Sequence, residues 1–381
     1  MLQTFKDDFN TTFDSFGDLV VHHQNQDSGS MWERAAVNTL QVEPLALTPL
    51  LPEESLPFAP GITQEALEDT AEKTGLVINL SGIRYPVRET AIKSLYDRAK
   101  ISGTALPKLS KENLADILNK CLPVHDKAKA LLLIREQKIS AVHSGDEKDY
   151  SVLPITELLE SIKDNLEDRF PGYEFDGAYT DHSFTSASWR FPGQRDALLR
   201  SYKKTLEGLG KKSLADKLVP GIRFCTSDVG LASAKVSALL YGLRVPIYIG
   251  NMLEVQHRGK TKVEDFTKIL DQLFAQFGDT IAKLEKLTTI YLDNPVNVMK
   301  RICKKLSLPK KEALEAISNF EMINGEEPAT AHDVFMELQE IMFNLKCAET
   351  PVSKMLFTEE NLSRALSLNW SDFDLPGAVD Y

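Results

Sequence analysis

The sequence predicts an α+β fold: a central antiparallel sheet with packed helices, an acidic N-terminal arm and a helical C-terminal region. Apolar and polar residues alternate over 232–240, and the chain turns at 242–246 and returns over 247–257, which is typical of a half-buried hairpin. Apolar residues then recur at helical spacing from Val263 to Leu287. The 381 residues are 43% hydrophobic with no long apolar run, which indicates globular cores and no membrane association.

The first part, residues 1–61, is predicted to be an acidic arm with a proline-rich connector. Phe5, Phe9, Phe13 and Phe16 recur at spacings of four, four and three residues, which favours an amphipathic helix. Its apolar face needs a partner surface, either on the same chain or on another copy, and we expect a homo-oligomer joined there. Five prolines between positions 44 and 60 indicate an extended connector.

The second part, residues 62–290, is predicted to be a basic α+β domain. Its first half, 62–138, has mainly helical spacing, including a helix at 110–122. The other expected elements are paired strands at 130–134 and 139–142, a helix over 155–170, strands over 173–179 and 184–191, and a helix or mobile arm over 194–217. Together with the hairpin above, these strands predict an antiparallel meander.

The last two parts are a helical region, 291–368, and an acidic aromatic tail, 369–381. Thr330-x-x-Asp333 is a capping box, which predicts a helix over 331–345. The tail from Trp370 to Tyr381 has two interpretations. It is either a disordered solubilising end or a recognition peptide that recruits a protein partner or competes with DNA.

Charge is segregated along the chain. The total of −11 divides into −10 for residues 1–75, +10 for residues 76–311 and −11 for residues 312–381. A basic middle between acidic ends is typical of nucleic-acid binders with modulating arms. In a chain of this length, acidic and basic residues also cluster by chance, without a functional cause. That alternative explanation of the charge pattern stays open.

Basic and aromatic residues of the middle part predict a nucleic-acid interface. Single strands bind where cations track the phosphates and aromatic rings stack on bases. The candidate stacking rings are Tyr179, Phe184 and Trp189. The candidate phosphate-binding residues are Arg190, Arg195, Arg200, Lys203, Lys204, Lys211, Lys212, Arg223, Lys235, Arg244, His257, Arg258 and Lys260. The structural alternative is that strand aromatics form core and helix lysines form a solvated face.

The common catalytic signatures are absent, so an enzyme is less expected than a binding protein. A polar corner follows one strand at Thr226, Ser227, Asp228 and Gly230, and the simplest interpretation is structural capping of backbone amides. A hydrolase using this corner with His257 is the alternative. We expect no cofactor and no metal.

Two weaker patterns do not change that expectation. His143, Asp146 and Asp149 suit a cation, but they read equally well as a hairpin loop. The four cysteines lie tens of residues apart, which indicates reduced thiols, and the N-terminus lacks a basic segment followed by an apolar one. We therefore expect the protein in the cytoplasm of a bacterial host cell.

Three short motifs stand in the middle of the chain: 139–144 with 150–153, the corner 226–230 and the turn 257–259. Together they resemble a family of phage- and plasmid-encoded proteins of unknown function. In that family the corner reads Asn-Ser-x-x-Gly, so Ser227 and Gly230 match and Thr226 does not; the family's Cys-x-Asn-Gly is also missing near Ile249-Gly250-Asn251. The resemblance covers about residues 95–265. It implies a mobile-element origin and an α+β core, and it supplies no reaction.

The leading hypothesis is that this is a mobile-element protein of DNA metabolism that binds nucleic acid. The expected ligand is single-stranded DNA during recombination or replication. The alternative is an interaction protein without enzymatic activity, either a virion component or an inhibitor of host defence.

Overall fold

A six-stranded antiparallel sheet lies at the centre of the computed structural model, which describes residues 4–47, 57–124, 128–146, 149–325 and 327–379. Its order is β1-β8-β9-β10-β11-β12. The strands are β1 (Asn10–Phe13), β8 (Glu174–Asp181), β9 (Thr185–Arg190), β10 (Val219–Thr226), β11 (Ala234–Tyr241) and β12 (Ile247–Val255). From β8 to β12 each strand pairs with the next along the chain. The predicted α+β fold and its antiparallel meander are confirmed.

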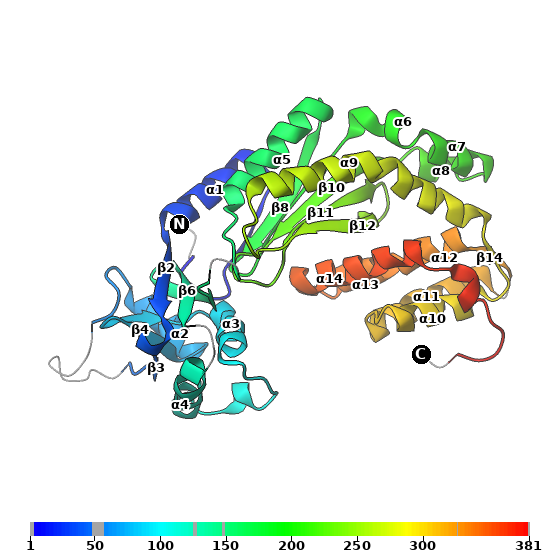
Figure 1. The fold of residues 1–381 in the computed structure, drawn as a ribbon. Helices are drawn as coiled ribbons and strands as arrows, with labels where there is room; N and C mark the ends of the chain where they lie inside the picture. The colour runs from blue at the N-terminus through cyan, green and yellow to red at the C-terminus, as the bar shows by residue number, and fades with distance from the viewer. Residues whose placement is uncertain (1–3, 48–56, 125–127, 147–148, 326, 380–381) are drawn as a thin grey trace.

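One face of this sheet is apolar and covered by helices. Figure 1 shows α1 (Phe16–Ser28), α5 (Ile155–Arg169) and the long α9 (Val263–Lys286) across it. Ile222, Phe224 and Val236 alternate toward this layer and are fully buried. Short helices α6 (Arg195–Leu198), α7 (Arg200–Gly208) and α8 (Lys212–Ala215) lie beyond it. Within the described residues no helix is long and apolar enough to cross a membrane.

A smaller lobe with its own core precedes α5. It holds two three-stranded sheets, β2-β6-β7 and β3-β4-β5. The strands are β2 (Ser30–Ala36), β3 (Leu40–Pro44), β4 (Leu76–Leu80), β5 (Ile83–Pro86), β6 (Lys129–Arg135) and β7 (Lys138–Ser144); the helices are α2 (Gln64–Glu72), α3 (Glu89–Ala99) and α4 (Lys111–Cys121). The predicted β6–β7 hairpin is confirmed. The mainly helical prediction for 62–138 is wrong over β4 and β5, whose residues are largely buried between neighbouring strands and helices.

The C-terminal region is helical, as expected. It comprises α10 (Pro295–Lys305), α11 (Lys310–Asn324), α12 (Ala331–Leu338), α13 (Glu340–Cys347) and α14 (Val352–Ser363), with the short strands β13 (Tyr291–Leu292) and β14 (Ala329–Thr330). The capping box of α12 is confirmed, since Thr330 and Asp333 bond reciprocally. In Figure 1, α14 lies under β12, on the face of the sheet opposite α9.

The predicted N-terminal arm is wrong, because residues 1–61 are woven into both lobes. Instead of a helix through Phe5 to Phe16, β1 forms an edge of the large sheet and the helix begins only at Phe16. The side chain of Asp7 is fully buried and its carboxylate binds Lys138 of β7 at 3.1 Å. The phenylalanine spacing arises from rings that pack individually, with Phe9 beside His182 and Phe16 beside Trp189. The expected oligomer contact loses its basis, and the proline-rich residues 48–56 lie outside the described residues.

The predicted free tail is also wrong for its described part. Trp370 is fully buried and donates from Nε1 to the carbonyl of Ala365 at 3.0 Å. Asp374 accepts from the backbone amides of Asp293 and Asn294, both at 2.8 Å. The segment is therefore folded onto the start of α10, and Trp370 is not available to a partner. Asp380 and Tyr381 lie outside the described residues.

Candidate functional site

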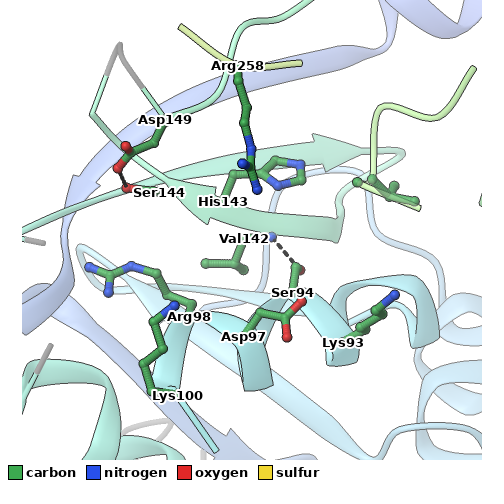
Figure 2. A pocket seen from close by; sticks show the side chains of 12 residues that line it. Lys93, Ser94, Asp97, Arg98, Lys100, Val142, His143, Ser144, Asp149 and Arg258 are labelled. Carbon is green, nitrogen blue, oxygen red and sulfur yellow. Dashed lines mark hydrogen bonds between the residues drawn. The ribbon is translucent and has the colours of Figure 1, made fainter. Parts of the chain in front are cut away.

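A cavity of about 660 Å³ lies between the small lobe and the loops at one end of the large sheet. Its walls come from α3, β7 and the loops that follow β7, β10 and β12 (Figure 2). A second cavity of about 440 Å³ adjoins it and shares His143, Gly230 and Arg258. We call the two together the cationic cleft, because Lys93, Lys100 and Arg258 border it.

The three cations that name the cleft have no carboxylate partner among the described residues. All three side chains are exposed. Lys93 and Lys100 come from α3 and its C-cap, whereas Arg258 reaches in from the loop after β12 toward His143 (Figure 2). Asp97 and Asp149 also line the larger cavity. Positive charge from two lobes therefore converges on one space with a smaller number of acids.

Arg98 adds a fourth cation to the larger cavity, deeper in its wall. Its Nη2 donates to the carbonyl of Lys129 at 3.4 Å. Burial lowers the pKa of Arg98 and the nearby Asp149 opposes that shift. An arginine keeps its proton at neutral pH under such a shift, so Arg98 stays a cation.

His143 is a fixed hydrogen-bond acceptor at the junction of the two cavities. Its ring stacks on Tyr150 with the centroids 3.8 Å apart and the planes at 8°. Nε2 lies 3.0 Å from the carbonyl oxygen of Asp228, which only accepts, so Nε2 carries the proton and Nδ1 keeps its lone pair. Burial lowers the pKa of His143 to about 4, so the ring is neutral at pH 7.

Gly230 keeps that wall open. Its φ is +83°, a left-handed conformation that favours glycine, and a Cβ there would lie 3.1 Å from Cε1 of His143. Any larger residue at position 230 would press on the imidazole and narrow the approach to it.

A buried ion pair holds the polar corner that supports His143. Nη2 of Arg135 donates to the Asp228 carboxylate at 2.5 Å. Burial alone would raise the pKa of Asp228, but the Arg135 guanidinium outweighs it and the net pKa is lowered. The Asp228 carbonyl also accepts from the Tyr150 hydroxyl at 2.8 Å. The β6–β7 hairpin and the large sheet thus meet at Asp228.

The corner does not present a nucleophile. Ser227 and Thr226 are fully buried, and the Ser227 hydroxyl accepts from the amide of Leu231 at 3.1 Å. Asp228 is occupied by Arg135, and His257 lies 3.4 Å from the Thr226 hydroxyl rather than from Ser227. The corner residues act as hydrogen-bond partners of the loop, and the hydrolase alternative lacks a reachable Ser227.

The predicted phosphate-binding residues do not form one face. At the α6–α8 end, Lys203 pairs with Asp196, Lys211 pairs with Asp333, Arg195 donates to the carbonyl of Ala215, and Arg200, Lys204 and Lys212 are exposed. On the sheet face toward α14, Arg223 pairs with Glu359 and Lys235 with Glu360, and Arg190 pairs with Asp176. Arg244 pairs with Glu340. His257, Arg258 and Lys260 lie at the opposite end, where Arg258 and the buried His257 line the cleft.

The predicted stacking rings are mostly covered. Trp189 is 1% exposed and packs against Phe16 and Phe175, so the prediction that it stacks on a base is wrong. Tyr179 is half-buried and its hydroxyl donates to Asp181 at 3.1 Å. Phe184 is also buried, but it lines a small cavity beside α14.

Sequence reasoning missed Lys93, Arg98 and Lys100. Lys93 and Lys100 are seven residues apart in the sequence, a spacing of two helical turns, although Lys100 is the left-handed C-cap of α3. That signal was present, but many solvated helices carry it. Their meeting with Arg258 depends on tertiary contacts between the two lobes.

The described residues hold no group of three or more His, Cys, Asp or Glu side chains placed for a metal ion. Nε2 of His143 is hydrogen-bonded to a backbone carbonyl, and Asp149 accepts a hydrogen bond from the Ser144 hydroxyl at 2.6 Å. The cleft thus offers cations, one neutral acceptor and hydroxyls, an arrangement that suits an anion with hydrogen-bond donors. No protein-family model, curated protein or solved structure matches this chain.

Proposed function

We propose that this protein binds nucleic acid along the cationic cleft. The observation that carries the proposal is the convergence of Lys93, Lys100 and Arg258, from two lobes, on a cavity of about 660 Å³. Cations held without carboxylate partners are free to neutralise phosphates, which is the main source of nucleic-acid affinity. The mobile-element setting, in recombination or replication, stays a prediction from the sequence.

The acidic total charge is compatible with this proposal. The −11 is concentrated in residues 1–75 and 312–381, whereas Lys93, Lys100 and Arg258 all belong to the segment with a charge of +10. Nearby charges dominate the electrostatic potential at a site, because salt screens interactions between charges more than about 10 Å apart at ordinary ionic strength. A phosphate in the cleft therefore experiences mainly the side chains that line it, where Lys93, Arg98, Lys100 and Arg258 outnumber Asp97 and Asp149.

The direct test is charge reversal in the cleft. A K93E/K100E/R258E variant is expected to bind a labelled oligonucleotide at least roughly 100-fold more weakly at low salt, because three phosphate contacts become repulsive. The matched control is K204E/K212E, which reverses exposed lysines at the α6–α8 end. Fluorescence anisotropy gives both affinities, and circular dichroism shows that the variants fold.

Equal affinity of the cleft variant and the unaltered chain would contradict the proposal. A larger loss for K204E/K212E would instead place the interface at the α6–α8 end.

A further inference from the structure

A third cavity, of about 140 Å³, lies between α14 and the sheet. Its apolar walls are Phe184, Leu231, Tyr248, Met252, Leu356 and Phe357. Leu231, Ala232 and Lys235 also line the second cavity of the cationic cleft. The small apolar cavity therefore borders the positively charged cleft.

We infer that this third cavity receives one unpaired nucleobase of a strand whose phosphates lie in the cationic cleft. The inference rests on the proposed function and specifies its ligand as single-stranded. A cavity of about 150 Å³ lined by Leu, Ile and Phe side chains is large enough for a benzene ring. A space of about 140 Å³ thus suits one planar ring system partly inserted from the cleft.

The rim of the cavity supplies polar groups for the edge of a base. Glu360 lines it and binds Lys235 through Oε2 at 3.1 Å and Arg364 through Oε1 at 2.9 Å, which orients the carboxylate. A carboxylate accepts hydrogen bonds from ring N–H or exocyclic amino groups. Each base presents at least one such donor at its edge, whereas its two flat faces are apolar. Ser237 and Ser353 add hydroxyls to the same lining. An apolar slot with a few polar groups at its edge is the usual form of a small-ligand site.

Phe357 is the aromatic side chain most available to a base. It is 61% exposed on α14, whereas Tyr248 and Phe184 are buried in the cavity wall. In a duplex the bases are stacked and paired, and taking one out costs a few kcal/mol. The cavity therefore favours single strands over duplexes.

The test compares Phe357→Ala with Phe357→Trp. The probes are a labelled single-stranded oligonucleotide, a hairpin duplex with the same sequence, and the single strand with one abasic site moved along it. Loss of one stacking contact is expected to weaken single-strand binding roughly five- to 100-fold in F357A, with F357W recovering part of that loss. The ratio of single-strand to duplex affinity is expected to fall in F357A. The abasic site that weakens binding to the unaltered chain most is expected to cause no further loss of binding to F357A.

Met322→Ala is the matched control, because Met322 is 77% exposed on α11 and lines none of the three cavities. It is expected to bind like the unaltered chain. Phe357 is exposed, so F357A is not expected to disturb the fold.

Three results would overturn the inference. If F357A binds the single strand as tightly as the unaltered chain while K93E/K100E/R258E does not, the base site is wrong and the cleft stands. If F357A weakens single-strand and duplex binding equally, the loss is not that of a base contact. If the unaltered chain binds no oligonucleotide, the proposed function and the base site both fail.

Discussion

The cationic cleft and the α6–α8 end are both rich in basic residues, yet they differ in what those residues contact. At the α6–α8 end Lys203 and Lys211 are paired with Asp196 and Asp333, whereas Arg200, Lys204 and Lys212 are exposed and line none of the three cavities. In the cleft Lys93, Lys100 and Arg258 have no such partner among the described residues. The comparison teaches that a count of cations along a sequence measures total charge, whereas binding depends on which cations stay unpaired after folding and converge on one cavity.

The two regions also differ in how they are held together. The cleft wall rests on the buried Arg135–Asp228 pair, whose side chains are 4% and 15% exposed. At the α6–α8 end the Lys203–Asp196 pair is open to water, with the Asp196 side chain 83% exposed. Breaking a buried pair leaves an uncompensated charge, but breaking an exposed one does not.

The largest expected effect follows from that difference. Arg135→Ala is expected to lower the free energy of unfolding by about 3–5 kcal/mol, because Asp228 stays buried without its cation. Lys203→Ala is expected to change it by about 0–1 kcal/mol. Urea unfolding measures both. Similar costs for the two variants would show that the corner does not hold the cleft wall.

Acid should also lower the folding stability of the protein through the histidines near the cleft wall. Burial lowers the pKa of His143 to about 4 from its ordinary 6.5, and the pKa of the nearby His23 to about 3. The unfolded chain therefore binds these protons first, so stability is full above about pH 6.5 and falls as the pH drops toward 4. His143 alone accounts for about 3 kcal/mol of that loss at pH 4.

Unfolding measured from pH 7 to pH 4 checks this expectation. His143→Gln removes one titrating ring and should flatten the curve, although its stability at pH 7 is lower. An unchanged slope would mean that folding does not lower the pKa of His143.

Salt dependence sharpens the comparison for binding. Each phosphate contact to a single strand contributes about 0.7 to the slope of log K against log salt. K93E/K100E/R258E should therefore reduce the slope by about 2. K204E/K212E should leave it unchanged. Titrations over a range of salt concentrations give the slopes, and equal reductions would remove the distinction between the two ends.

The smallest expected effect concerns the acceptor in the cleft. Gln at position 143 can keep an amide N–H toward the Asp228 carbonyl but loses the Nδ1 lone pair. Loss of one neutral hydrogen bond is worth about 0.5–1.5 kcal/mol, so binding at pH 7.5 should weaken about two- to tenfold. No change would show that Nδ1 does not contact the ligand.

Elements with a clear period were predictable from the sequence. The alternation around Lys235 and the helical spacing from Val263 onward correspond to β11 and α9, because one buried face imposes those periods. The spacing from Phe5 to Phe16 predicted a helix that does not form. Those rings belong to a turn, a strand and the start of a helix, and each packs separately.

The candidate site was predictable only in fragments. Arg258 and His257 were identified, but their neighbours Lys93 and Lys100 lie more than 150 residues away in the sequence. Ion pairs such as Arg223–Glu359, which remove a cation from the predicted interface, likewise join distant segments. Long-range pairing of this kind follows from the tertiary fold and has no local sequence signal.

Ultraviolet cross-linking of the unaltered chain to a single-stranded oligonucleotide, followed by mass spectrometry of the peptides, tests the central claim most directly. The account predicts cross-links in residues 89–100, 143–146, 149–150 and 256–262, around the cationic cleft. Cross-links confined to residues 195–217 would contradict it.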